Sequence, residues 1–257
     1  MRLTRLQPKH LVGRLLTGEH RDVSAGLDGE RQWIAGPPSD GEIYYLWLFL
    51  LWGSIMEPDV RWRLRHAWGF CERHSWAFLS VESAFRPSFP YTSALLYEDL
   101  MERARHAFGL TGPLRARRLR HALREQGPCI MCEMHYGPAS RAVAPGGVLE
   151  RGRDVSPLLT FAEATKAWWS PAVCGVCSGA GEPARCRRHL RDELRGRTAY
   201  QIEDSKRLVQ AATEHIARYA RSFRWESRGT DSDEDRAARI SIAGWCAGWR
   251  PLLELLR

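Results

Sequence analysis

Apolar residues recur at helical spacing along most of the chain, and the alternation typical of a β-strand is nowhere of comparable strength. From 42 to 108 this pattern predicts helices, with one beginning at Glu57-Pro58-Asp59 and a break between Pro87 and Pro90. Helical spacing returns at 158–169. A long helix is expected over 199–225, where one face carries Ile202, Leu208, Ala212, Ile216 and Tyr219. We therefore predict an all-α fold, a multi-helix bundle.

The longest apolar run covers 43–52 and is bounded by Glu42 and Gly53. It falls short of the roughly 20 residues that cross a bilayer, so it predicts a buried core helix and no membrane span. The first ten residues lack an apolar stretch followed by a small-residue cleavage site. We therefore expect a cytoplasmic protein, in which clustered cysteines favour metal binding or redox chemistry over disulfides.

Composition shifts divide the chain into four parts. Residues 1–41 predict a flexible, loop-rich N-terminal arm, because 17–41 is rich in Gly, Asp and Ser and contains Gly36-Pro37-Pro38. A first helical module is expected over 42–128; within it Gly112-Pro113 opens a helix with proline in its first turn. A Cys/His metal-binding module follows over 129–198. C-terminal helices fill 199–257, and the acidic run 231–235 suits the start of the last one, where the helix dipole favours negative charge.

Composition and charge add two constraints. With 257 residues and 44% hydrophobic content the chain can bury a core, and many of its 11 Trp residues are expected to be half-buried at packed faces. Tryptophan that is instead exposed would suggest a partner surface. The 38 Lys and Arg residues against 30 Asp and Glu give a formal net charge of +8. This excess permits an acidic partner such as nucleic acid without requiring one.

Six of the seven cysteines form four short pairs, each with two residues between its members. The pairs are Cys71 with His74, Cys129 with Cys132, Cys174 with Cys177, and Cys186 with His189. A two-residue gap lets both side chains converge on one ion, so four such half-sites can make two tetrahedral Cys3His metal sites that staple the bundle. Cys246 stands outside this arrangement.

The pairing of the half-sites stays open. Cys174 and Cys177 are separated from Cys186 and His189 by a short Gly- and Pro-containing loop, which favours one local site. The other site, Cys71 and His74 with Cys129 and Cys132, must be assembled across more distant positions. A crossed assignment would join Cys129 and Cys132 to Cys186 and His189. His135 could replace a ligand, and Cys71 with His74 could instead be an ordinary buried thiol and core imidazole.

Zinc is the expected metal at both sites, because mixed thiolate and imidazole ligation in a closed tetrahedron suits it, whereas iron–sulfur clusters mostly use four Cys. A [2Fe–2S] cluster with one His is the exception. Closed sites leave no position for substrate and are structural. The sequence also holds no Gly-rich phosphate loop, Gly-x-Ser-x-Gly elbow or His-Glu-x-x-His helix.

Two segments are rich in arginine, a residue whose planar fork suits phosphate. One predicted helix carries Arg115, Arg117, Arg118, Arg120 and Arg124, and the second cluster, around the last metal pair, includes Arg187, Arg188 and Arg191. Metal binding would hold the second cluster in place, as in zinc modules that bind nucleic acid. The alternative is that both are ordinary solvated helix faces.

Several motifs together resemble an uncharacterised prokaryotic family. They are Gly69-Phe70-Cys71-Glu72-Arg73-His74, Leu96-Tyr97-Glu98-Asp99-Leu100 and Cys186-Arg187-Arg188-His189. In that family a Cys-x-x-Cys, a helical hairpin and a Gly-Phe-Cys-x-x-His element occur twice in tandem. The resemblance covers about 42 to 250 and implies an all-helical fold with metal-like modules, but no activity. The Cys pair that the family has upstream of Glu42 is missing here, and the pair at Cys174 and Cys177 is additional.

These observations predict a non-enzymatic, zinc-stabilised helical adaptor that binds a protein or a nucleic acid through Arg- and Trp-rich surfaces. The alternative is a thiol redox or metal-dependent enzyme that uses a labile Cys-x-x-Cys. No small-molecule substrate is indicated by the sequence.

Overall fold

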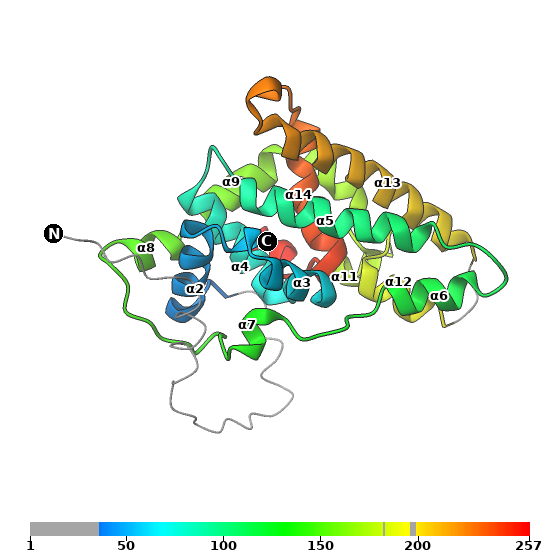
Figure 1. Cartoon of the computed structure of the whole chain (residues 1–257), viewed down its shortest axis with the longest axis horizontal. Coiled ribbons are helices and arrows are strands. Elements are labelled where there is room, and N and C mark those ends of the chain that lie inside the picture. The colour runs from blue at the N-terminus through cyan, green and yellow to red at the C-terminus, as the bar shows by residue number, and fades with distance from the viewer. Residues whose placement is uncertain (1–35, 182, 196–198) are drawn as a thin grey trace.

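The computed structural model describes residues 36–181, 183–195 and 199–257, and every regular element in these ranges is a helix. The expected all-α fold is confirmed for this part of the chain. The four longest helices in the described part of the chain are α4 (Glu72–Phe85), α5 (Tyr91–Phe108), α13 (Ala199–Ser222) and α14 (Asp233–Ala247). Helix α13 lies along α5 and also packs on α14, which in turn contacts α4 and α5 (Figure 1).

Shorter elements surround these four helices. In chain order they are α2 (Asp40–Leu51), η1 (Ser54–Met56), α3 (Pro58–Ala67), α6 (Arg115–Ala122), α7 (Ile130–Glu133), α8 (Val148–Arg153), α9 (Ser156–Ala164), α10 (Lys166–Trp169), η2 (Ser170–Ala172), α11 (Gly175–Ser178), α12 (Arg187–Glu193), η3 (Trp225–Ser227) and α15 (Arg250–Leu255). Helices α2, α8 and α9 pack on α4, while α10 and α12 pack on α14. Helices of different predicted modules are thus in contact, and the division into modules remains a prediction.

Helix α14 is the most enclosed element, with all of its residues from Ala237 to Ala247 buried. Small residues alternate with Ile and Trp there, so other helices can approach it from all sides. At Gly244 a β-carbon would lie 2.2 Å from the ring of Trp249, so only glycine permits this contact. The helix begins within the acidic run, as expected, and Ser232 and Asp235 form a reciprocal capping box at its start.

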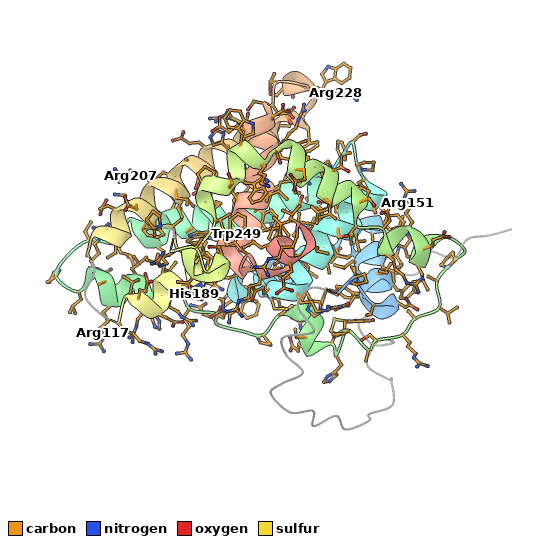
Figure 2. The ribbon with its side chains drawn as sticks, turned by 180° about the vertical axis from the view of Figure 1, so that it is seen from behind. Arg117, Arg151, His189, Arg207, Arg228 and Trp249 are labelled. Atoms are coloured by element: carbon orange, nitrogen blue, oxygen red, sulfur yellow. The ribbon has the colours of Figure 1, made fainter. Side chains whose placement is uncertain are left out.

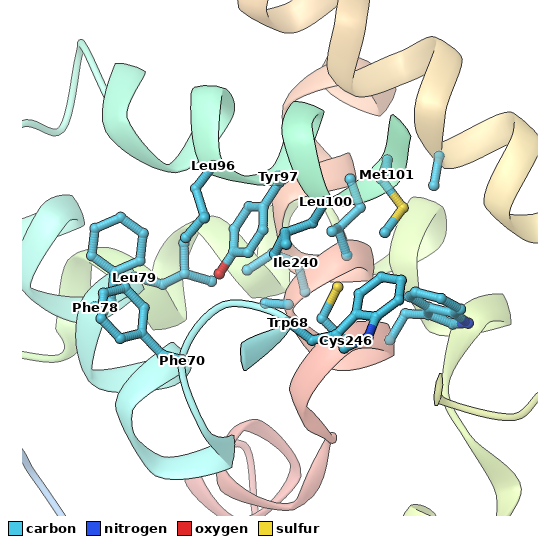
Figure 3. Close-up of a cluster of buried hydrophobic side chains, with 14 of the residues drawn as sticks. Trp68, Phe70, Phe78, Leu79, Leu96, Tyr97, Leu100, Met101, Ile240 and Cys246 are labelled. Carbon is cyan, nitrogen blue, oxygen red and sulfur yellow. The ribbon is translucent and has the colours of Figure 1, made fainter. Parts of the chain in front are cut away.

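Aromatic residues fill the core, where Trp68, Trp169, Trp245 and Trp249 are fully buried. Figure 3 shows Trp68 near Cys246 in the apolar cluster between α4, α5 and α14. The Trp68 indole nitrogen donates to the carbonyl of Arg124 at 3.2 Å, which satisfies its polar end. The expectation of mainly half-buried tryptophans was wrong, since these rings are enclosed on all sides. Four others are at least half exposed: Trp52, Trp62, Trp168 and Trp225.

Helix α2 differs from its prediction in two ways. It begins at Asp40, because Ser39 and Glu42 form a capping box that starts the helix inside the predicted arm. It is also not wholly buried, since Leu51 is 54% and Trp52 is 52% exposed. The helix lies in the outer layer, so only the face toward α4 and α8 is enclosed. The rest of the predicted arm, 1–35, lies outside the described residues.

Pro113 precedes α6 rather than occupying its first turn, because the helix begins at Arg115. Among the described residues, none of the helices combines the length and apolar character that a membrane crossing requires.

Candidate metal centres

The eight predicted ligands form two separate groups of four, and within each group the ligand atoms lie within 4.8 Å of one another. The first centre consists of Cys71, His74, Cys129 and Cys132. The second centre consists of Cys174, Cys177, Cys186 and His189. Of the two pairings considered from the sequence, the structure therefore has the uncrossed one. His135 is exposed and is not part of the first centre.

All four half-sites share one local geometry, which explains their two-residue spacing. Each begins with a cysteine in extended backbone conformation at the residue just before a helix: Cys71, Cys129, Cys174 and Cys186. The second ligand is then the third residue of that helix. A capping box joins the same two positions, the N-cap residue and the third residue of the helix, by hydrogen bonds. Here a metal ion would join them instead. The positive end of each helix dipole also favours a thiolate at these positions.

The distances in the first centre match the edges of a coordination tetrahedron. The Nδ1 atom of His74 lies 3.2 Å from Cys71 Sγ, 3.5 Å from Cys129 Sγ and 3.4 Å from Cys132 Sγ. Cys71 Sγ and Cys132 Sγ are 3.6 Å apart. With Zn–S near 2.3 Å and Zn–N near 2.1 Å, tetrahedral geometry places sulfurs about 3.8 Å apart and nitrogen about 3.6 Å from sulfur. One ion of this size fits between the four atoms.

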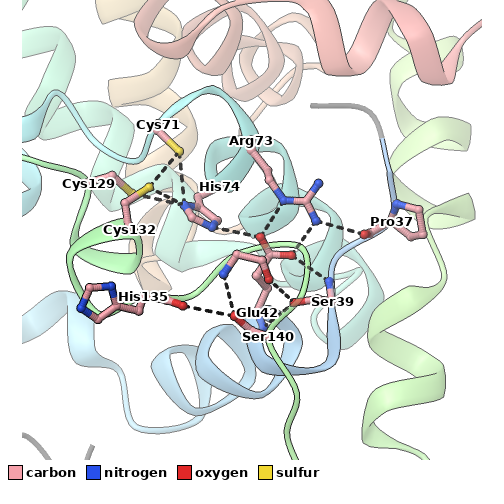
Figure 4. Close-up of polar contacts among 11 residues, drawn as sticks. Pro37, Ser39, Glu42, Cys71, Arg73, His74, Cys129, Cys132, His135 and Ser140 are labelled. Carbon is pink, nitrogen blue, oxygen red and sulfur yellow. Dashed lines mark hydrogen bonds and ion pairs between the residues drawn. The ribbon is translucent and has the colours of Figure 1, made fainter. Parts of the chain in front are cut away.

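A buried carboxylate orients the histidine of the first centre (Figure 4). Glu42 is completely buried, and its Oε1 lies 3.0 Å from His74 Nε2, on the ring edge opposite the sulfurs. Arg73 donates to both carboxylate oxygens at 2.7 Å, and the Ser39 backbone N–H donates to Oε2 at 2.7 Å. The His74 Nε2–H therefore donates to Glu42 and leaves Nδ1 free to bind metal, an arrangement common around zinc.

This carboxylate is held in its ionised form. Burial by itself would raise the pKa of Glu42, but the hydrogen bonds from His74 and Arg73 outweigh it and hold that pKa at about 2. Glu42 escaped the sequence analysis as a functional residue. Its only local signal is the Ser39-x-x-Glu42 cap, and nothing in the sequence links it to a histidine 32 residues away.

The second centre has the same kind of geometry in a shorter loop. His189 Nδ1 lies 3.3 Å from Cys174 Sγ, 3.5 Å from Cys177 Sγ and 3.2 Å from Cys186 Sγ, and the Cys177 and Cys186 sulfurs are 3.9 Å apart. A backbone hydrogen bond of 3.1 Å from Gly175 N–H to the Ala184 carbonyl closes the loop. Within the described residues, no carboxylate hydrogen-bonds to His189.

Without metal, each centre crowds three thiols around one imidazole. Hydrogen bonds from Cys132 and Cys71 hold the pKa of Cys129 far below its ordinary value. Burial opposes charge on His74, but the Cys129 and Cys132 sulfurs outweigh it and raise the pKa of that imidazole to about 11. Such a group balances its charge with protons, which a divalent cation displaces on binding. Both donor sets therefore fit a metal ion.

Cys246 lies apart from both centres. It is 2% exposed in the apolar core, and burial raises the pKa of its thiol to about 12. This is the environment of an inert structural cysteine.

An ion pair joins the helices that begin at the two centres. Arg188, between the ligands Cys186 and His189, lies 3.5 Å from the carboxylate of Glu72, which follows Cys71 directly. Glu72 also accepts a hydrogen bond from the backbone N–H of Arg250 at 3.3 Å. The start of α4 and the start of α12 are therefore adjacent in the fold.

Arg187 lies inside the protein, although the sequence suggested it as a nucleic-acid contact. Its side chain is 3% exposed, and its guanidinium donates to the carbonyls of Cys246 and Leu123 at 3.0 and 2.6 Å. It also pairs with Glu125 at 2.5 Å, and Arg191 reaches the same carboxylate at 2.6 Å. Its donors are thus used internally, and the residue fastens α12 to the core.

Most of the other arginines of the two basic segments meet at one cleft between α6 and α12, which pack side by side (Figures 1 and 2). This arginine cleft has a volume of about 820 Å³. Its basic walls are formed by Arg117, Arg118, Arg120, Arg124, Arg191 and Arg195. Among the described residues, Asp192 is the one acidic side chain in its lining. Arg115, which pairs with Glu203 at 2.8 Å, and Arg188 lie outside the cleft.

Comparison of the chain with protein-family models, with curated proteins and with solved structures gave no match. The resemblance to a family with tandem Cys/His modules therefore stays a prediction.

Proposed function

We propose that the protein is a zinc-stabilised helical adaptor that binds nucleic acid through the arginine cleft. The observation that carries the proposal is the convergence of two basic segments, far apart in sequence, on a single cleft. Arginines scattered over solvated helix faces would instead point in different directions.

The choice of zinc rests on the donor sets and their size. Three thiolates and one imidazole complete a tetrahedron, as in structural zinc sites, and leave no position for a substrate. A binuclear iron–sulfur cluster would spread its ligands over two iron atoms, whereas the four ligand atoms of each centre lie within 4.8 Å of one another. The spacing therefore favours one mononuclear ion in each centre.

The role of the second centre in this proposal is to place the wall of the cleft. Arg191 and Arg195 follow His189 along α12 and the residues after it, and Arg187 fixes the helix to α14 through Cys246. Preorganised arginines lose less conformational entropy when they pair with phosphates than mobile ones do. A rigid basic cleft is thus suited to a polyanionic backbone.

The decisive experiment is binding of a labelled single-stranded RNA and a DNA duplex, measured by fluorescence polarisation at increasing salt. The variant R117A/R120A/R124A should weaken binding at least tenfold and lower the salt slope by about two to three. A charge-matched control, R105A/R207A/R221A, changes exposed arginines outside the cleft and should bind within about twofold of wild type.

Two results would decide against nucleic acid. If wild type binds neither probe at about 50 mM salt, the partner of the adaptor is a protein and not a nucleic acid. If the cleft variant and its control lose affinity equally, binding follows net charge and not the cleft.

The exposure of Cys132 in the first centre favours one competing function. Cys132 is exposed while its three co-ligands are at least partly buried, so an oxidant could reach the site. A thiol redox protein should show several fast-reacting thiols in metal-loaded protein, whereas structural centres should protect six cysteines.

We further propose a cytoplasmic location, because either centre needs reduced cysteines in order to bind metal.

A further inference from the structure

A second cavity lies at the apex of the molecule, remote from both metal centres and from the arginine cleft (Figure 2, near Arg228). Its volume is about 760 Å³, within the range of small-molecule sites. Residues 87–90, helix α9, the end of α13 and the start of α14 enclose it. We call it the aromatic cavity, because its walls include Phe89, Phe161, Tyr219, Phe223 and Trp225.

One wall of the aromatic cavity is rigid. Phe223 packs edge-on against Phe89, with ring centroids 4.8 Å apart, and against Tyr219 at 4.9 Å. Such edge-to-face contacts fix ring orientation. The wall therefore offers a preformed apolar surface.

Trp225 lines the mouth of the cavity and is the most exposed tryptophan among the described residues, at 84%. It lies on the single turn η3, between the end of α13 and the start of α14. A large indole left in water beside a cavity is a surface that a ligand can cover.

Arg239 supplies a buried cation to the same cavity. Its side chain is 6% exposed, and its guanidinium carbon lies 4.7 Å from the ring of Phe161 and 5.4 Å from that of Tyr219. Its Nε has no hydrogen-bond partner among the described residues. The nearest carboxylate, Glu82, is 4.0 Å from its Nη1 and has an unpartnered oxygen of its own. Burying a guanidinium whose N–H donors are unpaired costs free energy unless an anion accepts hydrogen bonds from them.

The neighbouring charged side chains do not neutralise Arg239. Burial raises the pKa of Glu82, which favours its neutral form and weakens its pairing with Arg239. The two acids in the lining, Asp231 and Asp233, are 2.5 and 3.2 Å from Arg236 and are thus occupied. Arg228 adds a further positive charge to the lining.

We propose that the aromatic cavity binds a small aromatic carboxylate, with its ring against Trp225 and Phe223 and its carboxylate on Arg239. Among the described residues, the lining carries three arginines, Arg228, Arg236 and Arg239, against the two aspartates Asp231 and Asp233, and this excess of one positive charge suits a monoanion. A phosphate dianion would meet the carboxylates of Asp231 and Asp233 at the rim, so a carboxylate fits the charges better. This site is independent of the arginine cleft.

Isothermal titration calorimetry with indole-3-acetate on the full, zinc-loaded chain tests the proposal. The neutral isostere indole-3-acetamide probes the charge of Arg239 without altering the protein. The carboxylate should bind with a sub-millimolar dissociation constant and the carboxamide at least about tenfold more weakly. Equal affinities, or no binding of indole-3-acetate at millimolar concentration, would overturn the proposal.

Two variants locate the site. Trp225→Ala should weaken binding of indole-3-acetate about tenfold, because stacking on an aromatic ring is lost. The matched control is Trp62→Ala, which removes another exposed tryptophan, 61% exposed on α3, and should leave affinity unchanged. If Trp225→Ala binds as wild type does, the ligand lies elsewhere. Arg239→Gln, checked for folding by circular dichroism, should abolish the preference for carboxylate over carboxamide.

Discussion

The two metal centres have the same ligands and the same local geometry, but they differ in their surroundings. The first joins positions up to 61 residues apart, and the second joins positions up to 15 apart. His74 is buried and backed by Glu42 and Arg73, whereas His189 is only partly buried and has no carboxylate partner among the described residues. The same motif thus joins distant parts of the fold in one place and closes a short local loop in the other.

Loop closure accounts for little of this difference. By the chain-entropy relation, closing a loop of about 60 residues instead of 15 adds only about 1 kcal/mol. Burial has the larger effect, because removing metal from the first centre leaves the buried Cys129 thiolate without the cation that compensates it, at several kcal/mol for an uncompensated buried charge. We therefore expect the first centre to govern global folding and the second to govern a local unit.

The largest expected effect comes from Cys129→Ala in the first centre. Structural zinc contributes about 10–16 kcal/mol of binding free energy to folding, which exceeds the usual stability of a domain. The variant should hold one zinc instead of two and lose most cooperative unfolding, measured by elemental analysis and thermal circular dichroism. An unchanged melting curve would refute a structural role for this centre.

The next effect is that of Glu42→Gln, which leaves all ligands in place. Zinc affinity of the first centre should fall about 10- to 100-fold, because His74 loses its orienting carboxylate. The broken ion pair with Arg73 should cost about 3–5 kcal/mol of unfolding free energy. Chelator competition and denaturant unfolding measure the two losses. Glu133→Gln, which removes an exposed partner of Arg63, is the matched control and should change neither.

Loss of the second centre should be milder and local. Cys177→Ser should remove one zinc ion but leave the core to unfold cooperatively, because the loop 174–189 that carries the second centre can open by itself. Affinity for RNA should fall as α12 loses its anchorage. Hydrogen exchange should accelerate over 174–194 while α14 stays protected. Loss of protection throughout the chain would remove the distinction between the two centres.

The smallest effect concerns Asp235, remote from both metals. Burial would raise its pKa, but hydrogen bonds from Ser232 and His215 outweigh burial and lower it. Because the pKa of Asp235 is lower in the folded state than in the unfolded state, its ionised carboxylate stabilises the protein above the ordinary aspartate pKa of about 4. This stabilisation is lost as the pH falls. Asp235→Asn should therefore cost about 1–3 kcal/mol at pH 7 and less below pH 4. Urea unfolding of wild type and variant across this range measures the difference, and a gap independent of pH would contradict it.

The sequence predicted the helical class and the four ligand pairs because both depend on short-range patterns. Helical spacing repeats within a turn, and a Cys-x-x-Cys or Cys-x-x-His places its members at the cap and third residue of one helix. The choice of partner half-sites depends on how α4 and α7 pack, and the sequence left it open. Nothing local distinguishes Cys129 with His74 from Cys129 with His189.

The roles of Arg187 and Glu42 were misjudged from the sequence for the same reason. Arg187 lies within an Arg-rich run, yet it is buried because the Cys186 and His189 ligands turn it toward Glu125 and the Cys246 carbonyl. Glu42 looked like a helix-capping residue and also serves His74. In both cases a contact across more than 30 residues overrides what the local pattern indicates.

The most direct test of the account is zinc K-edge X-ray absorption on protein whose metal content is measured in the same sample. The account predicts two zinc ions per chain, each with three sulfurs near 2.3 Å and one nitrogen near 2.1 Å, and no oxygen ligand. Iron in place of zinc, a single ion per chain, or an oxygen in the first shell would contradict two closed Cys3His centres.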